Sequence, residues 1–149
     1  MYVNKIDYVG RITMSLLDIL LAEDPDTILA DASKSAEDTI SSMAGVLYDI
    51  DPELAKTGAD RNGYILGFAK SIGLYFIYQR ADDNQIPEKV IKNYDDALED
   101  LERISVGKKA LTLPPKNVAN NNSDGGESVT PEGNGLRRMG SQDKKTHQI

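Results

Sequence analysis

The chain has 149 residues, enough for one domain of ordinary size or for a smaller domain followed by a tail. Its 17 Lys and Arg against 24 Asp and Glu give a net charge of −7, which disfavours nucleic-acid binding by most of the chain. The lack of cysteine excludes disulfides, thiolate metal sites and cysteine nucleophiles. This composition predicts a soluble, intracellular protein.

The sequence offers no membrane or export signal. Its best apolar run, residues 16–22, is short and includes Asp18. A membrane-spanning helix needs about 20 mostly apolar residues, and an export signal would begin with a basic region that is missing here. We therefore expect no contact with a membrane.

The first half of the chain predicts two helices. Residues 14–22 suit a short helix, and Asp24 as N-cap with Pro25 at the first helical position would start a longer one. Apolar residues then recur every three or four positions at Leu29, Ala32, Ala36, Ile40, Met43, Leu47 and Ile50. This stripe predicts a long amphipathic helix that ends at Asp51, where a short turn runs through Ala55.

Residues 62–79 predict a third helix that is apolar around most of its circumference, as expected for the centre of a bundle. Gly67 and Gly73 each weaken this helix by about 1 kcal/mol relative to Ala. That cost is understandable if another backbone packs closely against both glycines.

A fourth helix is predicted to begin with Pro87 at its first position. Its apolar stripe consists of Val90, Ile91, Tyr94, Ala97, Leu98, Leu101 and Ile104. Gly107 suits a left-handed cap that ends the helix, and residues 110–113 would form a short extended segment. No alternation of apolar and polar residues is long enough to predict a sheet. The predicted fold class is therefore all-α, a small bundle of about four helices with a long extended C-terminal tail.

The composition changes near residue 114, which divides the chain into a helical body, residues 1–113, and a polar tail, residues 114–149. Residues 1–110 hold 20 acidic and 12 basic side chains, a charge of −8, whereas residues 111–149 hold 4 acidic and 5 basic ones, a charge of +1. The tail has too few apolar side chains to offset the entropy of ordering it. We therefore expect it to become ordered only through contacts with a partner.

The tail contains the candidate partner-binding residues, which are apolar anchors and basic side chains. They are Val118, Val129, Leu136, Arg137, Arg138, Met139, Lys144, Lys145 and Ile149. The basic pairs are compatible with a nucleic-acid contact or a nuclear signal, and equally with the acidic groove of a protein partner.

Residues 60–65 imitate the middle of a calcium-binding loop. If Gly63 were the sixth loop residue, Gly58 and Ala69 would occupy the first and twelfth positions, where oxygen ligands are required. We therefore interpret this segment as a turn into the third helix.

No catalytic, cofactor or metal site is predicted. The carboxylates in residues 49–53 and 95–102 are expected on solvated faces, without the burial that separates the pKa values of catalytic pairs. His147, the single histidine, lies in the tail and cannot build a triad or a histidine metal site within one chain. These observations predict that the protein is not an enzyme and needs no cofactor.

The most specific pattern lies in and around the fourth helix. It consists of Ile86, Pro87, Glu88, Tyr94, Ala97, Leu101, Ile104, Gly107, Lys108 and Leu111. Together with the helix that ends at residues 74–80 and the stripe over residues 28–48, it resembles the small head–tail adaptor proteins of tailed bacteriophages, also called head-completion or connector proteins. The resemblance covers residues 5–113.

This resemblance implies a ring, usually twelve-fold, under the portal at the capsid vertex. Such a ring extends the DNA channel and presents a docking surface to the tail. The implied partners are the portal protein, neighbouring copies of the chain, and a tail or further connector protein, with DNA passing non-specifically. The implied location is the virion at the capsid–tail junction, and the host cytoplasm during assembly.

Two other classes stay open. A helical binding protein, such as a small chaperone or regulator, would fold its C-terminal arm onto one partner in a one-to-one or two-to-two complex. A hydrolase or metal enzyme is disfavoured by the missing residue types, and loss of an activity on metal chelation would support it.

Overall fold

The computed structural model describes residues 1–81 and 85–117 of the chain. In these residues the backbone is helical and forms no β-strand, which confirms the predicted all-α class. The elements are the 3-10 helices η1 (Lys5–Tyr8) and η2 (Gly58–Asp60) and the α-helices α1 (Met14–Leu20), α2 (Pro25–Ala44), α3 (Asp51–Leu54), α4 (Gly63–Ala81) and α5 (Glu88–Ser105).

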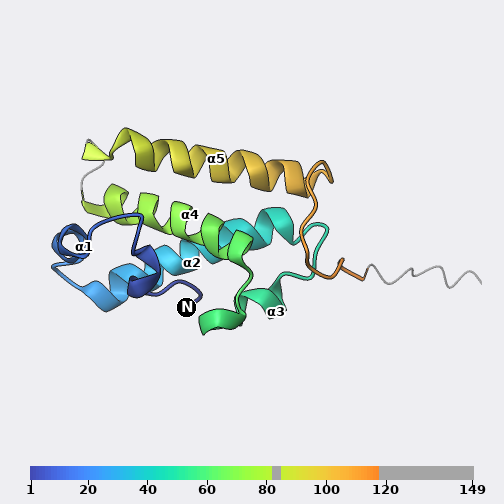
Figure 1. Cartoon of the computed structure of the whole chain (residues 1–149), viewed down its shortest axis with the longest axis horizontal. Helices are drawn as coiled ribbons and strands as arrows, with labels where there is room; N and C mark the ends of the chain where they lie inside the picture. The colour runs from blue at the N-terminus through green and yellow to red at the C-terminus, as the bar shows by residue number, and fades with distance from the viewer. Residues whose placement is uncertain (82–84, 118–149) are drawn as a thin grey trace, which may run out of the picture. The chain divides into compact units, whose positions relative to one another are not determined.

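Three long helices, α2, α4 and α5, lie side by side and contact one another (Figure 1). The middle one, α4, is the predicted central helix. Its buried residues are Ile65, Phe68, Ala69, Ser71, Ile72, Gly73, Leu74, Ile77 and Tyr78. Full burial of one large aliphatic side chain contributes about 1.5–3 kcal/mol, so these residues of α4 stabilise the core substantially.

Helix α2 begins as predicted but ends earlier. The side chain of Asp24 accepts a hydrogen bond from the backbone N–H of Thr27, and Pro25 opens the helix. The predicted continuation to Ile50 is wrong, since the helix stops at Ala44.

The early end of α2 has a tertiary cause. The N–H of Asp49 donates to the carbonyl of Pro114 at 3.0 Å, and the N–H of Lys116 donates to the carbonyl of Leu47 at 2.9 Å. These bonds use backbone groups that a longer helix would need for itself. They also attach residues 114–116, which lie beyond the predicted boundary of the body, to the end of α2.

Helix α5 matches its predicted stripe at Val90, Ala97, Leu101 and Ile104, which are buried, but the prediction is wrong for Ile91, which is 40% exposed. Pro87 is the N-cap rather than the first helical residue, because its extended backbone precedes the first turn. The end is as predicted.

Gly107 adopts φ +75°, and the N–H groups of Gly107 and Lys108 donate to the carbonyls of Ile104 and Arg103. Residues 110–113 do not form the predicted extended segment. Instead, the N–H of Leu111 donates to the hydroxyl of Tyr48.

The two glycines of α4 differ from each other: at Gly73 the backbone carbonyl of Ala32 in α2 would lie 3.7 Å from an added Cβ atom, as the predicted packing requires, and a side chain lies closer still. A Cβ atom at Gly73 would lie 2.4 Å from the hydroxyl oxygen of Tyr8, so it is a side chain of η1 that approaches closely. A Cβ atom at Gly67 would meet no atom within 4 Å, so the predicted close approach is wrong there.

The turn into α4 is confirmed, since the side-chain oxygen of Asn62 accepts hydrogen bonds from the N–H groups of Tyr64 and Ile65.

Candidate interaction surfaces

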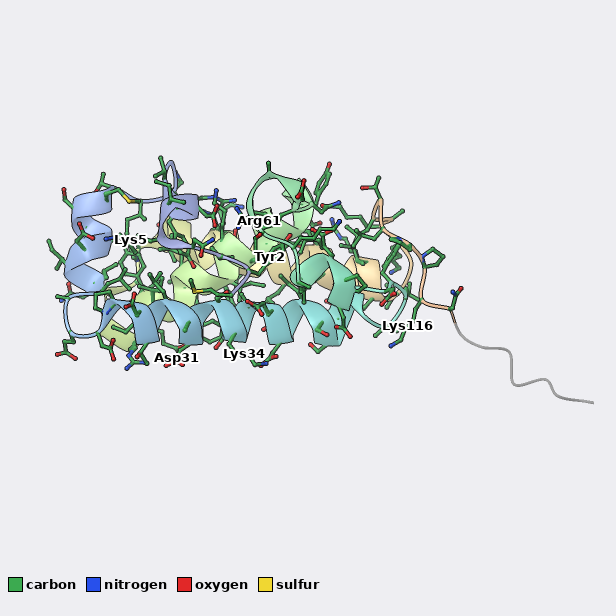
Figure 2. All side chains as sticks on the ribbon, turned by 90° about the horizontal axis from the view of Figure 1, so that it is seen from below. Tyr2, Lys5, Asp31, Lys34, Arg61 and Lys116 are labelled. Atoms are coloured by element: carbon green, nitrogen blue, oxygen red, sulfur yellow. The ribbon has the colours of Figure 1, made fainter. Side chains whose placement is uncertain are left out.

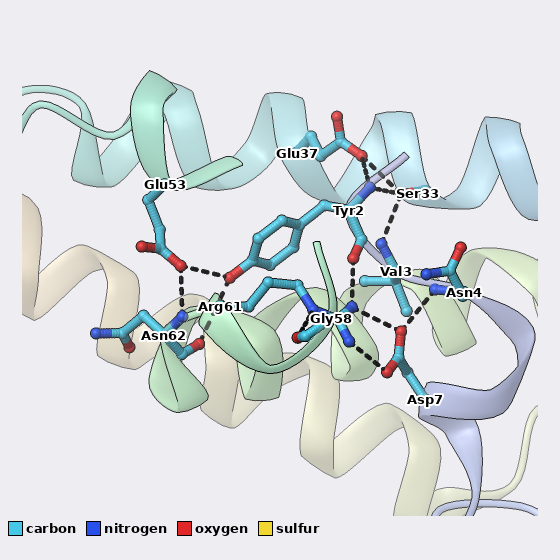
Figure 3. Close-up of polar contacts among 10 residues, drawn as sticks. All are labelled: Tyr2, Val3, Asn4, Asp7, Ser33, Glu37, Glu53, Gly58, Arg61 and Asn62. Carbon is cyan, nitrogen blue, oxygen red and sulfur yellow. Dashed lines mark hydrogen bonds and ion pairs between the residues drawn. The ribbon is translucent and has the colours of Figure 1, made fainter. Parts of the chain in front are cut away.

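The first residues of the chain form a strap, residues 1–4, that is anchored inside the bundle (Figure 3). Tyr2 and Val3 are both 1% exposed. The N–H of Tyr2 donates to Glu37 Oε1 at 2.7 Å and to Ser33 Oγ at 3.1 Å, and the N–H of Val3 donates to Ser33 Oγ at 3.2 Å. These bonds hold the strap against α2, where no repeating sequence pattern predicts it.

Glu53 of α3 is the deepest carboxylate of the described residues, only 2% exposed. The Tyr2 hydroxyl donates to its Oε1 at 2.9 Å, the N–H of Asn62 donates to the same oxygen, and Lys56 Nζ lies 2.7 Å from Oε2. The prediction that the carboxylates of residues 49–53 are all solvated is therefore wrong for Glu53. A charged group can be buried here because each of its oxygens has a hydrogen-bond donor.

The pKa values of this pair reflect both burial and hydrogen bonding. Burial acts to raise the pKa of Glu53, but the donors Asn62, Lys56 and Tyr2 outweigh it and lower the pKa below its ordinary value. Burial, and next the bond to the Glu53 carboxylate, raise the pKa of Tyr2. Glu53 is therefore ionised and Tyr2 neutral near pH 7.

Arg61, in the loop before α4, makes the second half of the network (Figure 3). Its two terminal nitrogens lie 2.7 and 2.8 Å from the two carboxylate oxygens of Asp7, and Nη1 also donates to the carbonyl of Tyr2. Nε donates to the carbonyl of Gly58. The hydrogen bond from Arg61, together with one from the N–H of Asn4, lowers the pKa of Asp7 despite its burial.

The network is internally satisfied. In residues 1–81 and 85–117, every buried side-chain nitrogen or oxygen has a hydrogen-bond partner. The hydrogen bonds of the network therefore join the strap, η1, α3 and the start of α4 to one another.

A groove of about 260 Å³ lies between α4 and α5, and Arg11 also lines it. Arg11 donates to the Ser71 hydroxyl, which itself donates to the carbonyl of Gly67. Asp100 at its edge is paired with Lys109 at 2.6 Å. Across the described part of the chain, no three His, Asp or Glu side chains are grouped to hold a metal ion.

Exposed apolar side chains gather at two places. The α1 patch consists of Ile6 of η1, Val9 directly after it, and Leu16 and Ile19 of α1, which are 40–70% exposed. An ion pair between Lys5 and Asp18 joins η1 to α1. The α5-end patch consists of Val46, Leu47 and Val106, which are 39–61% exposed and lie where α2 and α5 end. An open groove of about 430 Å³ along residues 9–14 adjoins the α1 patch. Exposed apolar groups that cluster in this way are typical of protein interaction surfaces.

Comparison with known proteins identifies the family. The family model described as "Bacteriophage Mu, Gp36" matches residues 2–130. The chain belongs to the bacteriophage Mu Gp36 family. No curated protein and no solved structure matched it. Family membership confirms the predicted phage origin and indicates a structural or assembly protein of a phage.

The tail residues predicted to bind partners lie outside the described part of this Gp36-family protein. They are Val118, Val129, Leu136, Arg137, Arg138, Met139, Lys144, Lys145 and Ile149. The family match includes the first two and ends before the other seven. Their contacts stay a prediction.

None of the helices described in this Gp36-family protein has both the length and the apolar character required to cross a bilayer.

Proposed function

We propose that this Gp36-family protein forms a ring that joins the portal vertex of a phage capsid to the tail and extends the DNA channel. The observation that carries the proposal is the match to a phage family over residues 2–130. The resemblance of residues 5–113 to head–tail adaptors supports the narrower role. The partners in this proposal are the portal protein, neighbouring copies, and a tail or further connector protein, and the role is structural rather than catalytic.

The surface of the described residues is compatible with a ring. A cyclic assembly uses head-to-tail contacts, in which one face of each copy meets a different face of the next. The α1 patch and the α5-end patch are two such different faces. In addition, the charge of −8 on residues 1–110 suits a channel that DNA crosses without binding, because like charges suppress phosphate contacts.

The tail supplies further contact area in this proposal. Residues 118–149 follow the paired segment at residues 114–116, and their apolar and basic side chains would bind the portal, a neighbouring copy or a tail protein. A short body with a long arm can in this way make a larger interface than its own surface allows.

Quantitative mass spectrometry of purified phage particles tests the proposal. The copy number of the chain is measured relative to that of the portal protein, and a ratio near one is expected for a connector ring. Absence of the chain from particles would overturn the proposal. The chain would then be an assembly factor or a binding protein, and a pull-down from infected cells would identify its partner.

A further inference from the structure

The α1 patch and the α5-end patch lie at opposite ends of the helical bundle. In Figure 1, α1 lies at one end of the bundle, and the C-terminal ends of α2 and α5 lie at the other. Figure 2 shows the same separation for Lys5 of η1 and Lys116, which follows the α5 end. One copy therefore presents both patches at once without the two faces obstructing each other.

One chain segment at each of these two ends carries charged side chains of a single sign, and the two signs are opposite. Residues 13–27 contain four acidic and no basic side chains, namely Asp18, Glu23, Asp24 and Asp26. Residues 103–117 contain four basic and no acidic side chains, namely Arg103, Lys108, Lys109 and Lys116. The first segment includes α1 and the start of α2, and the second includes the last turn of α5 and the residues that follow it.

Some of these charged side chains form ion pairs within the same copy. Asp18 is paired with Lys5, Arg103 with Glu99, and Lys109 with Asp100. The remaining charges of the two segments are exposed, and within the described residues none of them has an ion-pair partner. They are Glu23, Asp24 and Asp26 at the α1 end and Lys108 and Lys116 at the α5 end.

The basic end is held in a fixed position. Lys116 Nζ donates to the carbonyl of Gly45 at 3.1 Å. Its charge therefore lies directly beside the start of the patch, since Gly45 precedes Val46. A Cβ atom at Gly107 would lie 3.8 Å from Leu47, so the end of α5 adjoins the same patch and Lys108 follows directly. Apolar and basic groups thus form one surface.

We infer that the α1 patch of one copy binds the α5-end patch of a second copy. The contact joins exposed aliphatic groups at its centre and opposite charges at its rim, the arrangement that gives an interface its orientation. Contact between two α1 patches is disfavoured because it would bring like charges together. This inference rests on the proposed function, in which repetition of one head-to-tail contact closes the ring.

Cysteine cross-linking in particles tests the contact, and the natural chain contains no cysteine that could interfere. The Ile19→Cys/Val106→Cys variant, assembled into phage and treated with a short bis-maleimide, is expected to give a ladder of covalent oligomers. Each single variant is expected to stay monomeric. A Tyr64→Cys/Val106→Cys variant is the matched control, because Tyr64 is about as exposed as Ile19 but belongs to neither patch.

Charge reversal provides a second test that does not depend on the cross-linker. Glu23→Lys and Lys108→Glu are each expected to reduce incorporation into particles, and the double variant is expected to recover it. Circular dichroism of the purified chains verifies that each variant is folded. Failure of the double variant to recover incorporation, although it folds, would overturn the inference.

The outcomes separate the two proposals. If the chain is present at a ratio near one to the portal but the cysteine pair gives no ladder, the inference is overturned and the ring function stands. A dimer from Ile19→Cys alone, or a cross-link from Val106→Cys to the portal, would equally overturn it. Absence of the wild-type chain from particles would overturn the proposed function itself.

Discussion

Arg61 binds both carboxylate oxygens of Asp7 across 54 positions of sequence, at 2.7 and 2.8 Å (Figure 3). The side chains are only 7% and 10% exposed. The planar guanidinium makes a bidentate contact with the carboxylate, which a lysine could not make. This pair connects η1 to the loop before α4. Because both side chains are buried, loss of either one would leave the other as an unpaired buried charge.

Replacement of Arg61 by Met is expected to lower the free energy of unfolding by about 3 kcal/mol, because it leaves the Asp7 carboxylate buried without its partner. Urea denaturation measures the loss. The double variant Arg61→Met/Asp7→Asn should lose less than the sum of its single variants. The control is Lys34→Met, which removes an exposed pair with Asp38 and should change stability by less than about 1 kcal/mol.

The lowered pKa values of Asp7 and Glu53 predict a loss of stability in acid. Their ordinary values are 3.8 and 4.5. Because the folded pKa values are depressed, the stabilisation is present above about pH 4.5 and is lost as the pH falls through the folded values. The melting temperature of the wild type should therefore drop between about pH 6 and pH 3.

Glu53→Gln separates the contribution of that carboxylate from general acid effects. The variant should melt at a lower temperature than the wild type near neutral pH, but its melting temperature should fall less on acidification. Thermal scans of both proteins, followed by circular dichroism near neutral pH and at about pH 3, measure the difference. Parallel falls in the two proteins would contradict the assigned role of Glu53.

The two glycines of α4 should respond oppositely to the same change. Gly73→Ala is expected to destabilise the protein by about 1–3 kcal/mol, because its Cβ atom would collide with the hydroxyl of the buried Tyr8. Gly67→Ala should stabilise it by up to about 1 kcal/mol through helix propensity. Combination of Gly73→Ala with Tyr8→Phe should restore part of the loss, since the colliding oxygen is removed. Equal effects of the two alanine variants in denaturant titrations would show that Tyr8 does not approach Gly73 as described.

The acidic body predicts only weak retention of DNA. Binding of the full-length chain to duplex DNA, measured by fluorescence anisotropy, should be weak and nearly independent of salt concentration. Tight binding that falls steeply with salt would indicate phosphate contacts by several basic side chains, and it would contradict a channel that DNA crosses freely.

The sequence predicts those elements whose causes are local. The apolar surface of α4 and the stripe of α5 follow from side-chain spacing, and the left-handed φ of Gly107 follows from the needs of a helix end. The end of α2 could not be predicted in this way. Leu47 and Ile50 keep the helical spacing, yet the backbone there pairs with Pro114 and Lys116, which are more than sixty residues further along the chain.

The buried polar network around Glu53 and Arg61 could not be predicted from the sequence either. Glu53 and Arg61 stand in short polar segments, where charged side chains are normally solvated. Their burial depends on partners near the N-terminus, Tyr2 and Asp7, and no short-range pattern connects these positions. The only local signal is the apolar pair Tyr2–Val3 at the start of the chain, which is too short to define an element.

The anchoring of the strap also imposes an order of folding. The Tyr2 hydroxyl has Glu53 and the carbonyl of Asn62 as partners, so the strap cannot complete its contacts until residues up to 60 positions further along the chain are available. Contacts that span so much sequence close slowly relative to helix formation. The strap is thus expected to dock after the helices that supply its partners have formed.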